Sequence, residues 1–413
     1  MQRTPLENWI KTKIGADTLA AYQLKRLRET LRYVRENSRF YRDLLRGIKP
    51  DSIENIEDIS KIPFTAPDML AGDPNGFLCV PPHEVSRIVT LPTSGTTSRP
   101  KRLFFTPEDI ELTVVFFHHG MSALVRPGER VMIFMPGETP DSVGDVLKRG
   151  LARLGCEGLV YGAVSDYGDA SGALKASRAA CAVGLPAQLL ALSRIGGQPY
   201  VKSVLLSADY VPRAVIKALE ETWNCKVFTH FGMTETCYGG AVECAARAGA
   251  HMREADLLFE IVDPETGAKL PDGEPGELVF TTLTRRAMPL IRYRTGDYAR
   301  ILAEPCPCGN RFNRIDRLAG RIGGGITVSG VTLTMPMLDE VLFAVPGLRA
   351  FEAEVAARDG RDLLILTCDG GSPAELAAAL RALPAGFAAE IRRGVPQPIP
   401  NGMIKRRILD TRV

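Results

Sequence analysis

The stretch SVLLSADYVPRAVIKALEETWNCKVFTHFG, residues 203–232, predicts a strand, a helix and a second strand in succession. SVLLSAD and KVFTHFG are apolar runs with the length of buried strands. The segment from Pro212 to Trp223 between them is predicted to be a helix with proline in its first turn. A strand, a helix and a strand in this order are typical of an α/β fold with parallel strands.

The same alternation extends toward the N-terminus. RVMIFMP (130–136) is predicted to be a buried strand, VGDVLKRGLARLG (143–155) a helix that ends at its glycine, and EGLVYG (157–162) the next strand. Strands that alternate with helices indicate a largely parallel, doubly wound sheet. The first 45 residues are predicted to be helical, because their apolar residues fall on one stripe.

The pattern changes after about residue 255. LFEIVD (258–263), GELVFTTL (276–283) and DYARIL (297–302) alternate apolar and polar residues and are separated by turn-forming segments, so they predict a small antiparallel β unit. A glycine-rich crossing then leads into a short α+β segment. We therefore predict a large N-terminal domain, residues 1–318, with doubly wound mixed sheets plus the antiparallel unit, and a small α+β C-terminal domain, residues 319–413.

Composition excludes several classes of protein. A net charge of +3 over 413 residues gives no reason to expect nucleic acid or an anionic membrane as a partner. No apolar run approaches the roughly 18 residues that span a bilayer, and the start MQRTPLENWIKTKI does not have the pattern of a signal peptide. Nine cysteines without a framework of pairs favour thiols or a metal site in a reducing cytoplasm.

One polar loop, LPTSGTTSRPK (91–101), lies between apolar stretches. Its glycine lets the backbone approach an anion, its hydroxyl and N–H groups can donate to that anion, and Lys101 adds positive charge, so the loop is suited to cradle phosphate. A plain Ser/Thr/Gly turn remains the alternative from this pattern alone. The Walker pattern GxxxxGK[ST] is absent, so another nucleotide-binding class is required.

Five motifs in order make the chain resemble the adenylate-forming superfamily of acyl-CoA synthetases, and within it the phenylacetate–CoA ligase family. They are LPTSGTTSRPK (91–101), LSAD (206–209), FGMTET (231–236), RYRTGD (292–297), and DRLAGR followed by SGVTL (316–333). The resemblance covers nearly the whole chain. It implies a ligase that uses ATP, Mg²⁺ and coenzyme A on a small carboxylic acid, and a homodimer is compatible with it.

The resemblance also implies a role for individual residues. The flexible loop that holds the β- and γ-phosphates of ATP matches Thr93, Ser94, Gly95, Thr96 and Thr97. The segment lining the adenine matches Ser207, Ala208 and Asp209, with Phe231 and Gly232 against its other face.

The remaining matches concern the reacting phosphate and the ribose. Thr234 and Glu235 match the pair that contacts the α-phosphate and Mg²⁺, an ion that prefers one or two carboxylates plus phosphate oxygens. Asp297 matches the aspartate that binds the ribose hydroxyls, and Arg321 the arginine at the crossing into a small domain that rotates between the two half-reactions. Without the surrounding motifs, the two carboxylates would be interpreted as solvated surface groups.

One departure from the family pattern lies at the C-terminal end, where a lysine of a GK-type segment normally reaches the carboxylate and the α-phosphate. The tail reads IPNGMIKRRILD (399–410), which puts Met403 or Ile404 at that position. Lys405 is the candidate substitute, and efficient adenylation depends on whether it reaches the site. A catalytically impaired nucleotide-binding protein is therefore an alternative to a ligase. A second alternative is an enzyme that adenylylates a deazaflavin coenzyme or passes the acyl group to a carrier protein.

Four residues are candidate ligands of a structural zinc ion: Cys244, His251, Cys306 and Cys308. Three thiolates and an imidazole suit tetrahedral Zn²⁺, but the spacing is not the common CxxC, and incidental cysteines are the competing interpretation. Some relatives within the resembled family carry a Cys/His zinc site at these places. For the acyl pocket, the candidate wall is Phe116, Phe117 and His118, for which core packing is an equally good explanation.

Overall fold

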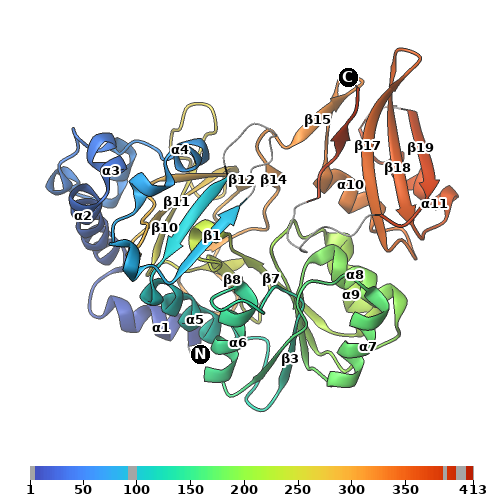
Figure 1. Ribbon diagram of the computed structural model, residues 1–413, viewed down its shortest axis with the longest axis horizontal. Coiled ribbons are helices and arrows are strands. Elements are labelled where there is room, and N and C mark those ends of the chain that lie inside the picture. Colours follow the sequence, from blue (N-terminus) through green and yellow to red (C-terminus); the bar gives the residue numbers. More distant parts are fainter. Residues whose placement is uncertain (1–4, 92–99, 385–387, 397–405, 413) are drawn as a thin grey trace. The chain divides into compact units, whose positions relative to one another are not determined.

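The computed structural model describes residues 5–91, 100–384, 388–396 and 406–412. The chain forms two compact units (Figure 1). The first unit consists of Met1–Ala123 and His230–Leu318, and the second of Leu124–Thr229 and Ala319–Val413. No helix among the described residues is both long and apolar enough to cross a membrane.

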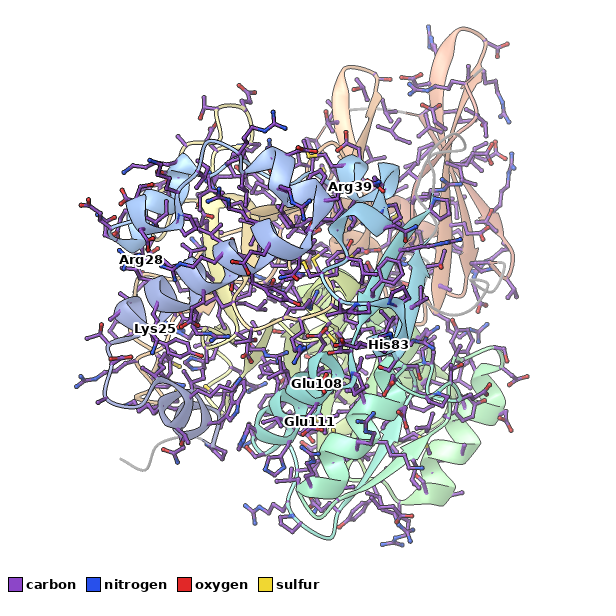
Figure 2. The ribbon with its side chains drawn as sticks, turned by 60° about the vertical axis from the view of Figure 1, so that its left-hand side comes forward. Lys25, Arg28, Arg39, His83, Glu108 and Glu111 are labelled. Carbon is purple, nitrogen blue, oxygen red and sulfur yellow. The ribbon has the colours of Figure 1, made fainter. Side chains whose placement is uncertain are left out.

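The N-terminal part of the first unit is helical, as predicted from the apolar stripe of the first 45 residues. Its helices are α1 (Pro5–Ile14), α2 (Leu19–Asn37), α3 (Arg39–Leu44), α4 (Pro67–Gly72) and α5 (Pro107–Met121). Helix α2 begins at Thr18, whose side chain accepts a hydrogen bond from the Ala21 N–H, and it buries Leu27 and Leu31. Its outer face carries Lys25, which points away from the protein in Figure 2.

The strands of the first unit are antiparallel. Strands β1 (Arg87–Leu91) and β2 (Lys101–Phe105) pair on either side of the polar loop. Strands β10 (Leu257–Val262), β11 (Gly276–Thr282) and β12 (Tyr293–Ala299) form the predicted antiparallel unit, with Phe259 opposite Phe280 and Phe280 opposite Tyr293. The short strands β8 (Ala241–Glu243), β9 (Ala250–Met252) and β13 (Arg314–Ile315) pair in the order β8–β9–β13.

The second unit contains the parallel strands. They are β3 (Arg130–Ile133), β4 (Glu157–Val160), β5 (Cys181–Gly184), β6 (Ser203–Leu206) and β7 (Lys226–Phe231), paired in the order β4–β3–β5–β6–β7. The last two residues of β7, His230 and Phe231, belong to the first unit. The helices that connect these strands are α6 (Val143–Arg153), α7 (Tyr167–Ser177), α8 (Pro186–Ile195) and α9 (Arg213–Trp223), with α6 on one side of the strands and α7 to α9 on the other (Figure 1). The α/β prediction from residues 203–232 is therefore confirmed.

The C-terminal part of the second unit has the predicted α+β character. It consists of the hairpin β15 (Gly325–Val328) and β16 (Val331–Thr334), α10 (Met335–Leu342), β17 (Ala350–Arg358), β18 (Arg361–Asp369), α11 (Pro373–Leu380), β19 (Ala388–Arg393) and β20 (Leu409–Asp410). Helix α10 contacts α9, and one hydrophobic core joins residues of both stretches, among them Trp223 and Phe343. The division into domains 1–318 and 319–413 stays a prediction.

Candidate active site

A tight turn between β7 and β8 presents Thr234 and Glu235. After Phe231 the chain enters a 3₁₀ turn over Thr234–Thr236. Cys237 and Tyr238 follow with φ values of 56° and 68°, a conformation that costs free energy for residues other than glycine. A Cβ atom at Gly232 would lie 1.9 Å from the Tyr238 carbonyl oxygen, so only glycine fits there. The path of this turn is therefore narrowly defined.

The Glu235 carboxylate lies in a small buried network within the first unit. Its side chain is 3% exposed and forms an ion pair with the Lys101 ammonium group. The hydroxyl of Tyr293 donates to Glu235 Oε1 at 3.1 Å and accepts from Lys101 Nζ at 3.3 Å. Residues from the polar loop, FGMTET and RYRTGD thus meet at one carboxylate. A single carboxylate of this kind fits a Mg²⁺ ion whose other ligands are phosphate oxygens and water.

Asp297 lies on β12 and is also buried, at 4% exposure. Its N–H donates to Thr295 Oγ1 at 3.0 Å, and the Thr295 hydroxyl donates to the Leu278 carbonyl at 2.7 Å. Gly296 between them has a φ of 71°, and the register with β11 shifts between Glu277 and Val279. This bulge fixes the direction of the Asp297 side chain by backbone geometry and local hydrogen bonds.

Ser207, Ala208 and Asp209 follow β6 directly in the second unit. The carboxyl ends of parallel strands are the usual ligand-binding edge of an open α/β sheet. The Ser207 N–H donates to the Gly184 carbonyl at 3.2 Å, and Ala208 has a φ of 69°. Arg321 lies on β14 (Gly320–Arg321) and is exposed. Phe231 is 7% exposed, with its ring centre 6.4 Å from that of Phe259.

Several predicted site residues lie outside the described part of the chain. They are Thr93, Ser94, Gly95, Thr96 and Thr97 of the phosphate loop, and Met403, Ile404 and Lys405 of the tail. Their assignments stay predictions.

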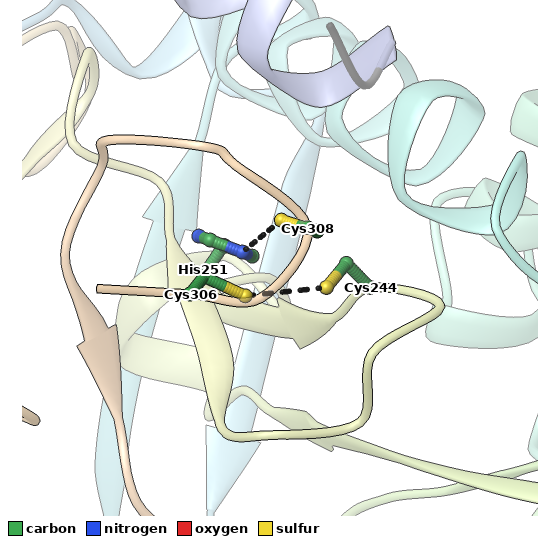
Figure 3. A group of neighbouring side chains, drawn as sticks. All are labelled: Cys244, His251, Cys306 and Cys308. Carbon is green, nitrogen blue, oxygen red and sulfur yellow. Dashed lines mark hydrogen bonds between the residues drawn. The ribbon is translucent and has the colours of Figure 1, made fainter. Parts of the chain in front are cut away.

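The four candidate zinc ligands come together in the first unit (Figure 3). Their ligand atoms all lie within 4.8 Å of one another. Cys244 Sγ is 3.7 Å from Cys306 Sγ, and Cys308 Sγ is 3.4 Å from His251 Nε2. His251 Nδ1 lies 3.3 Å from the Phe312 carbonyl, a contact that leaves Nε2 to face the cysteines. This donor set fits tetrahedral Zn²⁺.

Burial keeps the Cys244 and Cys308 thiols of this cluster protonated, so a metal ion that binds here would have to displace their protons. Burial raises the pKa of the Cys244 thiol to about 12, and it also raises the pKa of Cys308. Thiols with raised pKa values stay neutral at pH 7 unless a cation stabilises their thiolates. Cys237 is not part of this cluster: it directly follows the Thr234–Thr236 turn, and its thiol donates to the Asp109 carbonyl at 3.6 Å.

The candidate wall of the acyl pocket lies on α5. Phe116 and Phe117 are buried, and their ring centres are 6.2 and 5.9 Å from that of His230 on β7. His118 is half-buried. These contacts account for Phe116 and Phe117 by core packing, and His230 joins them as a neighbour that sequence reasoning missed.

Burial lowers the pKa of His230 from 6.5 to about 4. The folded state therefore disfavours the protonated imidazole. The contribution of the neutral imidazole to the free energy of unfolding is fully present above pH 6.5 and is lost as the pH falls toward 4. We expect the free energy of unfolding to fall by about 1–2 kcal/mol per such histidine between pH 7.5 and 5. In urea unfolding, the His230→Asn variant should show a smaller decrease in the free energy of unfolding between pH 7.5 and 5 than the wild type shows.

The exposed His83 (Figure 2) provides the matched control. His83→Asn should keep the wild-type pH dependence. Equal pH dependence in His230→Asn and the wild type would contradict the assignment to His230.

Comparison with known proteins identifies the family and agrees with this fold. The family model described as AMP-binding enzyme matches residues 73–283. The phenylacetate-coenzyme A ligase of Thermus thermophilus is 32% identical over 362 residues, which cover 83% of this chain and 79% of the relative. The enzyme of the same name from Aromatoleum evansii is 31% identical, covering 81% and 78%. The chain belongs to the phenylacetate–CoA ligase family of adenylate-forming enzymes.

A solved structure supports the fold. The crystal structure of 2-hydroxyisobutyryl-CoA ligase, in the postadenylation state with an acyl-AMP, matches with a TM-score of 0.78 at 22% identity. The match covers 94% of this chain and 89% of that one.

Proposed function

We propose that the protein is an ATP-dependent carboxylate–CoA ligase that forms an acyl-adenylate and then an acyl-CoA thioester. The observation that carries the proposal is the network of Lys101, Glu235 and Tyr293 at the Thr234–Glu235 turn. It presents one carboxylate, one cation and one hydroxyl together, in a chain of the phenylacetate–CoA ligase family.

In the first half-reaction the substrate carboxylate attacks the α-phosphate of ATP, and pyrophosphate leaves. Catalysis by the chain then consists of positioning and of stabilising the charge that develops on phosphate oxygens. Glu235 would hold Mg²⁺, which neutralises phosphate charge when bound. Thr234 donates toward the α-phosphate, Asp297 accepts from the ribose hydroxyls, and Lys101 contributes positive charge.

In the second half-reaction the CoA thiol attacks the acyl carbonyl, and AMP leaves. We infer that residues 319–413 act as a mobile domain that rotates between the two half-reactions, with Leu318–Ile322 as its hinge. The glycines of IGGGI (322–326) favour such a pivot.

An aromatic acid such as phenylacetate is the proposed substrate. The relatives from Thermus thermophilus and Aromatoleum evansii are called phenylacetate-coenzyme A ligases, which supports this choice of acid. Zinc at Cys244, His251, Cys306 and Cys308 is proposed to be structural, because four protein ligands leave no open position for catalysis. The nine free cysteines support a reducing, cytoplasmic location, and a homodimer stays a proposal from the family resemblance.

Exchange of labelled pyrophosphate into ATP, measured with a panel of acids, tests the ligase function. We expect exchange with phenylacetate or a related aromatic acid. ATP binding without exchange for any acid would favour the impaired nucleotide-binding relative, for which the absent tail lysine is the specific argument. Exchange without thioester formation on added CoA would favour another acceptor, such as a carrier protein.

Lys405→Ala tests the substitute for the tail lysine. If Lys405 acts in adenylation, exchange should fall by about 10- to 100-fold, because a charged contact to the reacting phosphate is lost. Lys25→Ala, which removes an exposed lysine of α2, should leave the rate unchanged. An unchanged rate in Lys405→Ala would exclude that residue.

A further inference from the structure

Arg285 contacts the main chain of the turn that carries Thr234 and Glu235. It lies between β11 and β12 and is 7% exposed. Its Nη1 donates to the Glu235 carbonyl oxygen at 2.5 Å, and its guanidinium carbon lies 5.2 Å from the centre of the Phe105 ring. The arginine thus holds the main chain of the residue whose carboxylate meets Lys101 and Tyr293.

The segment that carries Arg285 is itself held in place. The Asp109 carboxylate accepts from the N–H groups of Arg286 at 2.7 Å and Ala287 at 3.0 Å. The same carboxylate accepts from the Thr106 N–H at 3.1 Å, in the capping box that begins α5. A single buried aspartate therefore fixes both the start of a helix and the loop next to Arg285.

The C-terminal end of the turn is hydrogen-bonded to a layer of buried polar groups that includes Thr113 and Arg253. The Thr113 hydroxyl of α5 donates to the Cys237 carbonyl at 2.7 Å, and Arg253 Nη1 donates to Thr113 Oγ1 at 3.3 Å. A cavity of about 20 Å³ lies within this layer, lined by residues that include Thr236, Arg253 and Arg285. That space holds about one water molecule, so the turn has little room to move.

Placing a guanidinium here is costly. Burial lowers the pKa of Arg285, and a buried cation is retained only when its contacts compensate for desolvation. Its hydrogen bond goes to a carbonyl oxygen, where an uncharged donor of suitable length would also serve. The positive charge contributes a further effect: Asp109 and Glu235 attract it and Arg253 repels it, so the guanidinium is held toward the turn by charge as well as by the hydrogen bond.

We propose that Arg285 is a positioning residue for adenylation, which holds the Thr234–Glu235 main chain so that the Glu235 carboxylate and the Thr234 hydroxyl face the metal-bound phosphates. This inference rests on the proposed ligase function. Arg285 lies outside both sequence motifs that identify the site, FGMTET and RYRTGD.

Arg285→Met tests the proposal in the full-length enzyme, with Arg286→Ala as the matched control. The Arg286 side chain is exposed, 3.5 Å from Glu84, and alanine keeps its N–H. We expect Arg285→Met to lower pyrophosphate exchange by about 10- to 100-fold and to raise the Mg²⁺ concentration for half-maximal exchange by about threefold or more. Methylguanidinium should restore part of the rate to the shorter Arg285→Ala. Arg286→Ala should match the wild type.

The Mg²⁺ dependence separates positioning from a general loss of stability, which would lower the amount of active enzyme without changing that dependence. A folded Arg285→Met with wild-type Mg²⁺ dependence would overturn the inference. If Arg285→Met does not fold, Arg285→Lys is measured by the same criterion, because it keeps the charge but loses the planar fork. If the wild type shows no exchange with any acid, the ligase proposal fails, and the Mg²⁺ dependence of ATP binding measured by calorimetry decides the role of Arg285.

Discussion

Glu235→Gln is expected to slow acyl-adenylate formation by about 100- to 1,000-fold, the range found when one preorganised charge-stabilising group is removed. The amide keeps the shape of the side chain but binds Mg²⁺ poorly, and it leaves the partly buried Lys101 ammonium group without its anion. Rapid-quench measurement of acyl-AMP in a single turnover checks the rate, and thermal unfolding of each variant checks that the protein is folded.

Glu108→Gln is the matched control. Glu108 is an exposed residue of α5 (Figure 2) with the same side chain as Glu235. It should keep the wild-type rate. A folded Glu235→Gln that forms acyl-AMP within threefold of the wild type would contradict the role given to Glu235 and would leave the buried ion pair as a purely structural feature.

Removal of zinc is expected to have the largest effect on stability. Protein purified without chelators should contain about one zinc ion per chain, and a structural site of this type contributes several kcal/mol to folding. Dipicolinate treatment should lower the melting temperature, and added Zn²⁺ should restore it. Cys244→Ser should reproduce the loss, because serine does not replace a thiolate ligand.

Cys368→Ser separates this effect from the general cost of changing a buried cysteine. Cys368 lies on β18 in the second unit, outside the four-residue cluster. The Cys368→Ser variant should keep the zinc content of the wild type, as measured by elemental analysis. Zinc well below one ion per chain in the wild type, together with an unchanged melting temperature in chelator, would remove the metal from the proposal.

The parallel strands were predicted where a long helix separates two apolar runs, as in residues 203–232. Strand β5 and helices α7 and α8 were missed, because β5 is only four residues long, CAVG, and two of them are alanine and glycine. A run this short and small carries no clear period. The antiparallel unit was easier to predict, since its strands alternate and turn-forming residues separate them.

The site was predicted one motif at a time, but the contacts between motifs were not. Lys101 and Glu235 are 134 positions apart, and nothing in either motif indicates that they form an ion pair. Tyr293 was within a recognised motif and could have been proposed from it. Arg285 carried no signal, because its function depends on a hydrogen bond to a main-chain carbonyl, which no side-chain pattern encodes.

The cysteine–histidine cluster also bears on how the chain reaches its folded state. Cys244 and Cys306 are 62 positions apart, and the segment between them contains all of β10, β11 and β12. If the proposed zinc ion is bound, the metal bridge would close that segment into a loop and would remove conformations from the unfolded ensemble, as a disulfide does. Unlike a disulfide, such a bridge would open when the metal is removed, without a reductant, so metal supply would change the stability of the antiparallel sheet.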